Sequence, residues 1–322
     1  MSTPERLVEC VPNLSEGREM ETIDRAADAV RTTPGALFLD RTSDPDHHRS
    51  VLTFAGPAEA VVAAMDAVLA VAVERIDMRR HQGAHPRIGA VDVVPFVPLG
   101  TTTMADCVAL ARTFGARAAE RFGIPVFLYA EAATRPGRRI LAEIRRPQVE
   151  GLPGFLASPD GIPDFGPRRA HPTAGALVTG ARPFLVAWNI DLESDDVALA
   201  KRIARAVRER DGGLPRVQAL GLQLPELGCA QVSMNLLDTA VTPIHRVWER
   251  VGALAAEAGV RVHSSELIGL IPQAALLAAA DAAGTDPGLP LERRVSAGAA
   301  AVGIRDFRPD RVLEIRLAAA RG

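Results

Sequence analysis

The amino-acid sequence predicts an α+β fold with two ferredoxin-like (βαββαβ) subdomains and a ligand cleft between them. Three observations lead to this prediction. The chain has 322 residues, which is more than one domain usually contains and fits two. Apolar runs typical of strands and helices follow the order β-α-β-β-α-β in each half. A stretch rich in Gly and Pro, residues 147–175, joins the halves and has the length of a functional loop.

The elements of the first half follow from short apolar runs between turn-forming residues. Strands are predicted at residues 7–11, 36–40, 51–54, 91–97 and 126–129, and helices at 16–31, 57–76, 104–122 and 138–146. Ser15 is expected to cap the first helix, because its hydroxyl can accept a hydrogen bond from a free backbone N–H. Residues 41–49 are expected to form a polar loop. Pro95 lacks a backbone N–H, so its strand is expected at a sheet edge or at a bulge.

The second half repeats the order of elements without a convincing repeat of residues. Strands are predicted at residues 184–190, 217–224, 231–237 and 260–270, and helices at 194–210, 242–258 and 272–283. Asp195 and Asp196 favour the start of the first of these helices. Thr242 is expected to cap the second helix, with Pro243 at its first position. Residues 311–317 are expected to add one strand.

Composition excludes several classes of protein. Hydrophobic residues make up 48% and charged residues 24%, an ordinary globular balance. With 37 basic and 39 acidic residues the chain has no basic excess, so no nucleic acid partner is expected. The N-terminus carries no signal peptide, and the apolar run 60–73 is too short to span a bilayer, so no membrane association is expected. Three widely spaced cysteines indicate reduced core thiols and a cytoplasmic location.

The densest set of chemically active residues is HQGAHPRIG at 81–89. Its glycine and proline disfavour a helix, and no third ligand has metal-site spacing, so no metal is expected. The segment instead suits a histidine that is held by stiff backbone and exchanges protons near neutral pH. Arg87 could bind a carboxylate through its planar guanidinium. A solvated polar loop is the alternative interpretation.

Three further segments carry polar side chains. DPDHHRS at 44–50 places carboxylates beside imidazoles, which could serve as acid–base groups or substrate anchors, although such loops are normally solvated. Glycines in the loop 163–175 permit close approach to a ligand, and Arg168 and Arg169 could meet an anion; an ordinary linker is the alternative. QVSMNLLD at 231–238 alternates polar and apolar residues, as half-buried strands do. No phosphate-binding glycine motif is present.

Together these segments resemble the formiminotransferase family. The matching motifs are ECVPNLSEGR (9–18), DPDHHRSVLTFAGP (44–57), HQGAHPRIGAVDVVPFVP (81–98), VFLYAEAA (126–133), PDFGP (163–167), TGARPFLVAWNIDL (179–192), QVSMNLLD (231–238) and ELIGLIP (266–272). They cover essentially the whole chain in one order. The sequence departs from the family at His48, where Asn is usual, at Met234, where some members have Thr, and at residues 221–223, which lack an aromatic pair.

The resemblance implies a transferase of two subdomains, 1–183 and 184–322, usually dimeric, which binds tetrahydropteroylpolyglutamate between the halves. It implies that the second histidine of the H-x-x-x-H-P-R motif, His85, is catalytic. Asp44, His48 and Arg87 become possible substrate or acid–base groups. The folate-binding residues would be Gly166, Pro167, Arg168, Arg169, Ala170, His171, Pro172, Thr173, Ala174 and Gly175.

The implied reaction transfers the formimidoyl group from N-formimidoyl-L-glutamate to N5 of tetrahydrofolate, in histidine degradation and one-carbon metabolism. One imidazole with a pKa near neutrality would take the proton from N5 and give it to the leaving nitrogen. Because the chain ends where the transferase part would end, a separate cyclodeaminase is expected to process the product. Alternatives are a related enzyme that uses 5-formyltetrahydrofolate or formimidoylglycine, and a non-catalytic folate-binding sensor.

Overall fold

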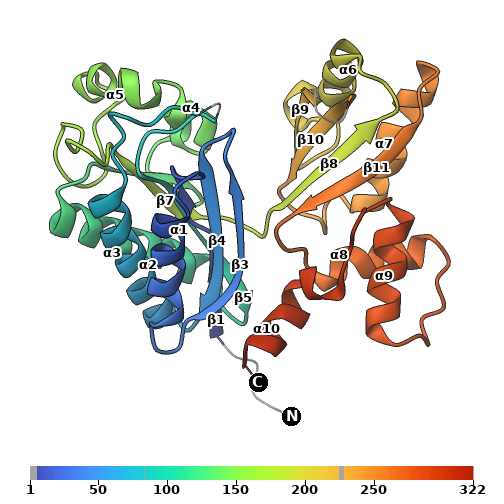
Figure 1. Cartoon of the computed structure of the whole chain (residues 1–322), viewed down its shortest axis with the longest axis horizontal. Helices are drawn as coiled ribbons and strands as arrows, with labels where there is room; N and C mark the ends of the chain where they lie inside the picture. Colours follow the sequence, from blue (N-terminus) through green and yellow to red (C-terminus); the bar gives the residue numbers. More distant parts are fainter. Residues whose placement is uncertain (1–5, 84, 225–227, 322) are drawn as a thin grey trace. The chain divides into compact units, whose positions relative to one another are not determined.

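The computed structural model describes residues 6–83, 85–224 and 228–321. The chain divides into two compact units, Met1–Pro183 and Phe184–Gly322, each with its own sheet, its own helices and its own apolar core (Figure 1). The predicted α+β class is therefore confirmed. In the part of the chain that is described, no helix is long and apolar enough to cross a membrane.

The first unit is built on a seven-stranded sheet. Its strands are β1 (Arg6–Cys10), β2 (Asn13–Leu14), β3 (Leu37–Asp44), β4 (Arg49–Gly56), β5 (Val91–Gly100), β6 (Val126–Ala130) and β7 (Leu177–Ala181). β3 pairs with β4. The short strands β1 and β2 follow one another between β4 and β5, and each pairs with both of them. All of these pairings are antiparallel. β7 then pairs in parallel with β5 and β6. From β1 to β5, with α1 and α2 between them, the elements follow the predicted β-α-β-β-α-β order with one addition, the two-residue strand β2 before α1.

Helices cover both faces of this sheet. They are α1 (Met20–Arg31), α2 (Ala58–Arg75), α3 (Met104–Phe122), the 3-10 turn η1 (Pro136–Arg138), α4 (Leu141–Arg145) and α5 (Gln148–Ala157). α1, α2 and α3 lie side by side on one face (Figure 1). Strand side chains alternate between the two faces of a sheet. Val94 therefore packs in the core under these three helices, whereas the neighbouring Val93 packs with Leu152 of α5 on the other face. Thr103 and Asp106 close a capping box at the start of α3.

The second unit has a four-stranded antiparallel sheet in the order β11-β8-β10-β9. Its elements are β8 (Val186–Leu192), α6 (Val197–Val207), η2 (Glu209–Asp211), β9 (Val217–Leu224), β10 (Cys229–Leu236), α7 (Ile244–Glu257), β11 (Val262–Ile268), α8 (Gln273–Ala282), α9 (Leu291–Ala301), η4 (Pro309–Arg311) and α10 (Leu313–Arg321). The β-α-β-β-α-β order from β8 to β11 is again the predicted one. Asp196 caps α6 by accepting from two backbone N–H groups, as predicted.

The segment after α9 pairs with the outer edge of this sheet. The backbone N–H of Ser265 donates to Gly303 at 2.7 Å, and that of Arg305 donates back to Ser265 at 2.9 Å. The backbones of Ile271 and Leu313 are joined in the same way further along. These bonds bring the end of the chain against β11.

Two predictions about the first helix and its neighbours were wrong. α1 begins at Met20, and its N-cap is Glu19, which makes no side-chain cap. Ser15 lies upstream, directly after β2, and donates its hydroxyl to the carbonyl oxygen of Gly89 at 2.7 Å. The polar residues 41–49 are mostly strand, because β3 and β4 extend toward each other and leave only the turn 45–48.

Pro95 does not put β5 at an edge, because β5 has partners on both sides. The other half of that prediction, an irregular position, agrees with the structure. Pro95 faces the break between β1 and β2, where the antiparallel ladder is interrupted, and its carbonyl accepts from Val11. The missing N–H of the proline is thus placed where no regular partner exists.

Burial explains the remaining misses. α5 forms within the predicted loop although it contains Pro153, because Leu152 and Leu156 are buried against the sheet. The strand β7, Leu177–Ala181, was also not predicted. The tail 311–317 is helical rather than extended, α9 was not predicted, and the N-cap of α7 is Pro243 rather than Thr242.

Replacing Gly89 by alanine is expected to destabilise the first unit by roughly 1–3 kcal/mol, as overpacking does. A Cβ at this position would lie 1.8 Å from the carbonyl oxygen of Ala176, which is backbone and cannot rotate away. Gly154→Ala in α5 is the control, because nothing lies within 4 Å of its Cβ and alanine favours a helix. Thermal unfolding measures both, and equal midpoints would contradict the packing argument.

Candidate functional site

Four of the seven histidines come together in the first unit, although they are far apart in sequence. His47 and His48 lie at the turn between β3 and β4, and His81 and His85 follow α2. We call this group the histidine site. A small pocket in it is lined by Leu14, Ser15, His47, His48, Arg49, His81, His85, Arg87 and Asp92. Three residues predicted for a site, His48, His85 and Arg87, therefore lie together.

The imidazole of His85 is held by an arginine of β4. Nη1 of Arg49 donates to Nε2 of His85 at 2.5 Å. Because a guanidinium is only a donor, Nε2 accepts, and the proton of the ring is assigned to Nδ1. Nδ1 is buried and has no hydrogen-bond partner among residues 6–83, 85–224 and 228–321. His85 is therefore a neutral imidazole whose free lone pair is occupied by Arg49.

Burial and nearby positive charges keep His85 neutral. Burial lowers the pKa of His85 from 6.5 to about 2, and the charges of Arg49 and Arg145 act in the same direction. Burial and Arg145 also lower the pKa of Arg49 to about 10, so that Arg49 stays charged at neutral pH. The expectation that His85 has a pKa near neutrality is therefore wrong for the protein without substrate.

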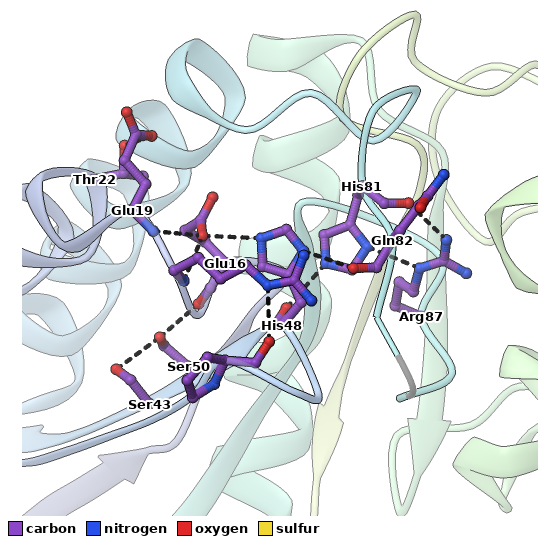
Figure 2. Close-up of polar contacts among 11 residues, drawn as sticks. Glu16, Glu19, Thr22, Ser43, His48, Ser50, His81, Gln82 and Arg87 are labelled. Atoms are coloured by element: carbon purple, nitrogen blue, oxygen red, sulfur yellow. Dashed lines mark hydrogen bonds and ion pairs between the residues drawn. The ribbon is translucent and has the colours of Figure 1, made fainter.

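His48 is held between two acceptors (Figure 2). Its Nε2 donates to Oε1 of Glu16 at 3.0 Å and its Nδ1 donates to the carbonyl oxygen of Gln82 at 3.0 Å. The ring of His48 is therefore fixed on both sides by hydrogen bonds. Oε1 of Glu16 also accepts from the backbone N–H groups of Arg18 and Glu19. Burial acts to raise the pKa of Glu16, but these hydrogen bonds and His48 outweigh it and lower the pKa.

His81 links His48 to Arg87. Nε2 of His81 donates to the carbonyl oxygen of His48 at 2.9 Å, and its Nδ1 accepts from Nε of Arg87 at 3.0 Å. The two imidazole rings stack with centroids 4.2 Å apart. Nη1 and Nη2 of Arg87 bind the carboxylate of Glu150 in α5. Because all three guanidinium nitrogens of the buried Arg87 already donate, its role here is to position His81.

Asp44 reaches the histidine site through His47. Nδ1 of His47 donates to Oδ2 of Asp44 at 2.6 Å, and the His47 ring stands edge-on to that of His85 with centroids 6.2 Å apart. Partial burial acts to raise the pKa of Asp44, but hydrogen bonds from the backbone and ring of His47 lower it overall. Asp44 is thus placed to orient His47.

The predicted folate-binding loop, residues 166–175, is attached to the same segment as His85. The backbone N–H of Ala90 donates to Ala174, and that of Ala176 donates to Ile88, both at 2.9 Å. Gly175 has a φ of +70°, and a Cβ on it would lie 2.3 Å from the carbonyl oxygen of Ile88. Only glycine permits this approach of two backbones, which brings the end of the loop beside the histidine site.

Other members of the loop have structural partners. Nδ1 of His171 accepts from the backbone N–H of Ala174 at 2.9 Å and so shapes the turn. The guanidinium of Arg168 donates to carbonyl oxygens at the end of α5, those of Leu156, Ala157 and Ser158. Arg169 is exposed.

Sequence analysis missed several residues of the site. Glu16 lies in the ECVPNLSEGR motif but was not singled out, and Arg49 was counted as part of a polar loop. Asp92 and Arg145 form an ion pair beside Arg49 and His85. Nothing in the local sequence marks Arg145, because only the packing of α4 against the sheet brings it near.

A second polar cluster lies in the second unit. The buried Asp191 accepts from Gln231 at 2.8 Å and from Ser264 at 3.0 Å, and it forms an ion pair with Arg305. Met234 on the neighbouring strand is buried in the apolar core, so this departure from the family pattern is a matter of packing. Within the described parts of the chain, no three His, Cys, Asp or Glu residues are arranged to hold a metal ion.

Two family models match the chain. The formiminotransferase domain, N-terminal subdomain, matches residues 7–182, and the formiminotransferase domain matches residues 187–284. These matches cover most of both units.

Curated relatives match over nearly the same range. The glutamate formimidoyltransferase of Thermoplasma acidophilum is 45% identical over 299 residues, which cover 91% of this chain and 98% of that protein. The glutamate formimidoyltransferase of Streptococcus pyogenes is 41% identical, covering 86% of this chain and 92% of that protein. The formimidoyltransferase-cyclodeaminase of Rattus norvegicus is 46% identical over 85% of this chain, which spans 52% of the rat protein. The chain therefore belongs to the formiminotransferase family.

Proposed function

We propose that the chain is a glutamate formimidoyltransferase, which transfers the formimidoyl group from N-formimidoyl-L-glutamate to N5 of tetrahydrofolate and forms 5-formimidoyltetrahydrofolate and glutamate. The observation that carries the proposal is the neutral, half-buried imidazole of His85 in a chain whose relatives from Thermoplasma and Streptococcus bear this name. Tetrahydrofolate is the co-substrate, and no metal is part of the proposal. The reaction belongs to histidine degradation and folate one-carbon metabolism.

His85 is proposed to carry one proton between two nitrogen atoms. N5 of tetrahydrofolate attacks the formimidoyl carbon, a C–N bond forms, and the N5 proton passes to Nε2 of His85. The bond from that carbon to the glutamate nitrogen then breaks, and His85 returns the proton to the leaving nitrogen. Only a neutral imidazole can begin this sequence. Acid–base assistance of this kind contributes roughly 10²–10⁴-fold to the rate.

In the protein without substrate, the surroundings of His85 oppose its role as a proton acceptor. A pKa of about 2 makes the imidazole a poor acceptor, and Arg49 occupies Nε2. An ideal acid–base group has a pKa near the working pH. Substrate binding must therefore remove or offset the positive charge beside the ring.

The loop residues 166–175 are proposed to contact the folate. Support comes from the pairing of this loop with residues 88–90, which places it beside His85. Among the three arginines considered as carboxylate anchors, Arg87 and Arg168 already donate to protein acceptors, so the exposed Arg169 is the best candidate for the glutamate tail. Asp44 and His48 are proposed to position the site through His47 and Glu16.

The arrangement around the site is also part of the proposal. Residues 1–183 and 184–322 are proposed to be the N-terminal and C-terminal formiminotransferase subdomains. We propose a cytoplasmic homodimer whose product passes to a separate cyclodeaminase. Analytical ultracentrifugation with and without folate tests the dimer.

The purified protein is expected to convert formimidoylglutamate and tetrahydrofolate into equal amounts of glutamate and 5-formimidoyltetrahydrofolate. The folate product is measured as methenyltetrahydrofolate after acid treatment, and glutamate is measured in the same samples. Parallel reactions contain formimidoylglycine or 5-formyltetrahydrofolate, and turnover with these alone would point to the related enzyme. Folate binding without turnover of any donor would identify a sensor and defeat the proposal.

His85→Gln is expected to lower kcat at least roughly 10²-fold while folate binding changes little, because glutamine fills the space but exchanges no proton. The matched control is His263→Gln, which removes an exposed histidine of the second unit. Fluorescence titration with folate and the coupled assay measure both properties. Near-normal turnover of His85→Gln would remove His85 from the mechanism.

Acid is expected to destabilise the wild type more than His85→Gln. The pKa of His85 is lowered in the folded protein, so below pH 6.5 the unfolded chain binds a proton that the folded chain excludes. Above pH 6.5 this effect on the free energy of unfolding is absent. As the pH falls from 6.5 to 5, the free energy of unfolding decreases by about 1.4 kcal/mol per pH unit. Urea unfolding at pH 7 and pH 5 compares the two proteins, and parallel losses would show that His85 is protonated in the folded state.

A further inference from the structure

Two guanidinium groups lie beside one neutral imidazole, and the proton transfer proposed above uses neither. Arg49 from β4 and Arg145 from α4 both exert positive charge on His85, and each lowers its pKa. His47, from the turn before β4, acts in the same direction. Asp92 of β5 forms an ion pair with Arg145. The carboxylate of Asp44 is engaged by His47, and both Asp44 and Asp92 act on Arg49 as negative charges.

Several buried donors in this place lack hydrogen-bond acceptors. Within the described ranges, Nε of Arg49, Nε of Arg145 and Nδ1 of His85 are buried and have no hydrogen-bond partner, and Nη2 of Arg145 has only its ion pair with Asp92. Buried polar groups are normally satisfied, and an unmet buried donor is costly. A carboxylate has two oxygens that accept several hydrogen bonds and fits the planar fork of an arginine.

We propose that Arg49 and Arg145 bind a carboxylate of the formimidoyl donor, and that this draws Arg49 away from Nε2 of His85. The inference rests on the proposed function. Two changes follow from one binding event. The carboxylate neutralises positive charge beside His85, and the lone pair of Nε2 becomes free to accept the proton of N5. Arg49 thus blocks the base until the donor is bound.

The geometry of the substrates selects the donor rather than the folate as the source of this carboxylate. The α-carboxylate of glutamate is attached to the same carbon as the nitrogen that must receive the proton from His85. A carboxylate beside His85 is therefore in reach of that group. The glutamate tail of folate lies beyond the p-aminobenzoyl group, far from N5. A phosphate would also suit two arginines, but neither proposed substrate contains one.

The direct test is NMR of the wild-type protein labelled with ¹⁵N-histidine, with L-glutamate as the probe and His85→Gln to assign the signal. Without glutamate, the His85 nitrogens are expected to show the neutral Nδ1–H form at pH 6. With glutamate, the Nε2 signal is expected to shift and the pKa of His85 to rise. An unchanged His85 signal up to the solubility limit of glutamate would overturn the inference, whatever the enzyme assay gives.

Variants of Arg49 test whether this arginine binds the donor. Arg49→Gln is expected to raise KM for formimidoylglutamate roughly 10–100-fold, as the loss of a charged hydrogen-bond partner does, and to leave KM for tetrahydrofolate nearly unchanged. Arg49→Lys should restore only part of the affinity, because lysine lacks the planar fork. Arg41→Gln, on the neighbouring strand β3, is the control, since Arg41 pairs with Asp24 in α1.

The outcomes distinguish the inference from the proposed function. If the wild type shows no formimidoyl transfer but glutamate still shifts the NMR signal of His85, the carboxylate site stands and the assigned reaction fails. If transfer occurs and Arg49→Gln, shown to be folded by circular dichroism, keeps a normal KM for formimidoylglutamate, the carboxylate site fails and the reaction stands. Equal increases in both KM values would show a structural role for Arg49 and overturn the inference.

Discussion

The backbone pairing between residues 88–90 and 174–176 is the constraint on which the candidate site depends. It joins the end of the loop 166–175 to the segment that carries His85 and Arg87. The two backbone segments approach so closely that Gly89 and Gly175 have no space for a side chain. Ser15 adds a third segment by donating to Gly89. A rigid backbone frame of this kind fixes side chains more accurately than a loop alone.

Within that frame, the ring nitrogens of the histidines have different hydrogen-bond roles because their neighbours differ. Both ring nitrogens of His48 face acceptors, whereas Nδ1 of His81 accepts from Arg87. In His85 it is Nε2 that accepts, from Arg49. The environment, rather than the residue type, decides which imidazole can accept a further proton. Arg87 contributes by donating to His81, while the rest of its guanidinium is bound to Glu150.

The fold could be predicted further than the site. Local patterns were sufficient for α2 and α3 and for the strands of the second unit, because their apolar residues recur at regular spacing over enough residues. They failed for α5 and α9, whose helices depend on burial of a few residues such as Leu152 and Val295. Motif resemblance predicted His85 and the loop 166–175 as site residues, but it could not point to Arg145, which reaches His85 only after α4 packs. Nor could it reveal that Arg87 is occupied by Glu150.

The end of the chain has a consequence for the solubility of the second unit. A sheet edge with free N–H and C=O groups is a template for aggregation, and β11 would be such an edge. Residues 303–305 cover it by bonding to Ser265, and Val302 and Val312 fill the core beneath. The matched family domain ends at residue 284, before this cover begins. A fragment cut at that limit would therefore expose both a strand edge and apolar core, so the packed form of the second unit needs the chain at least to Leu313.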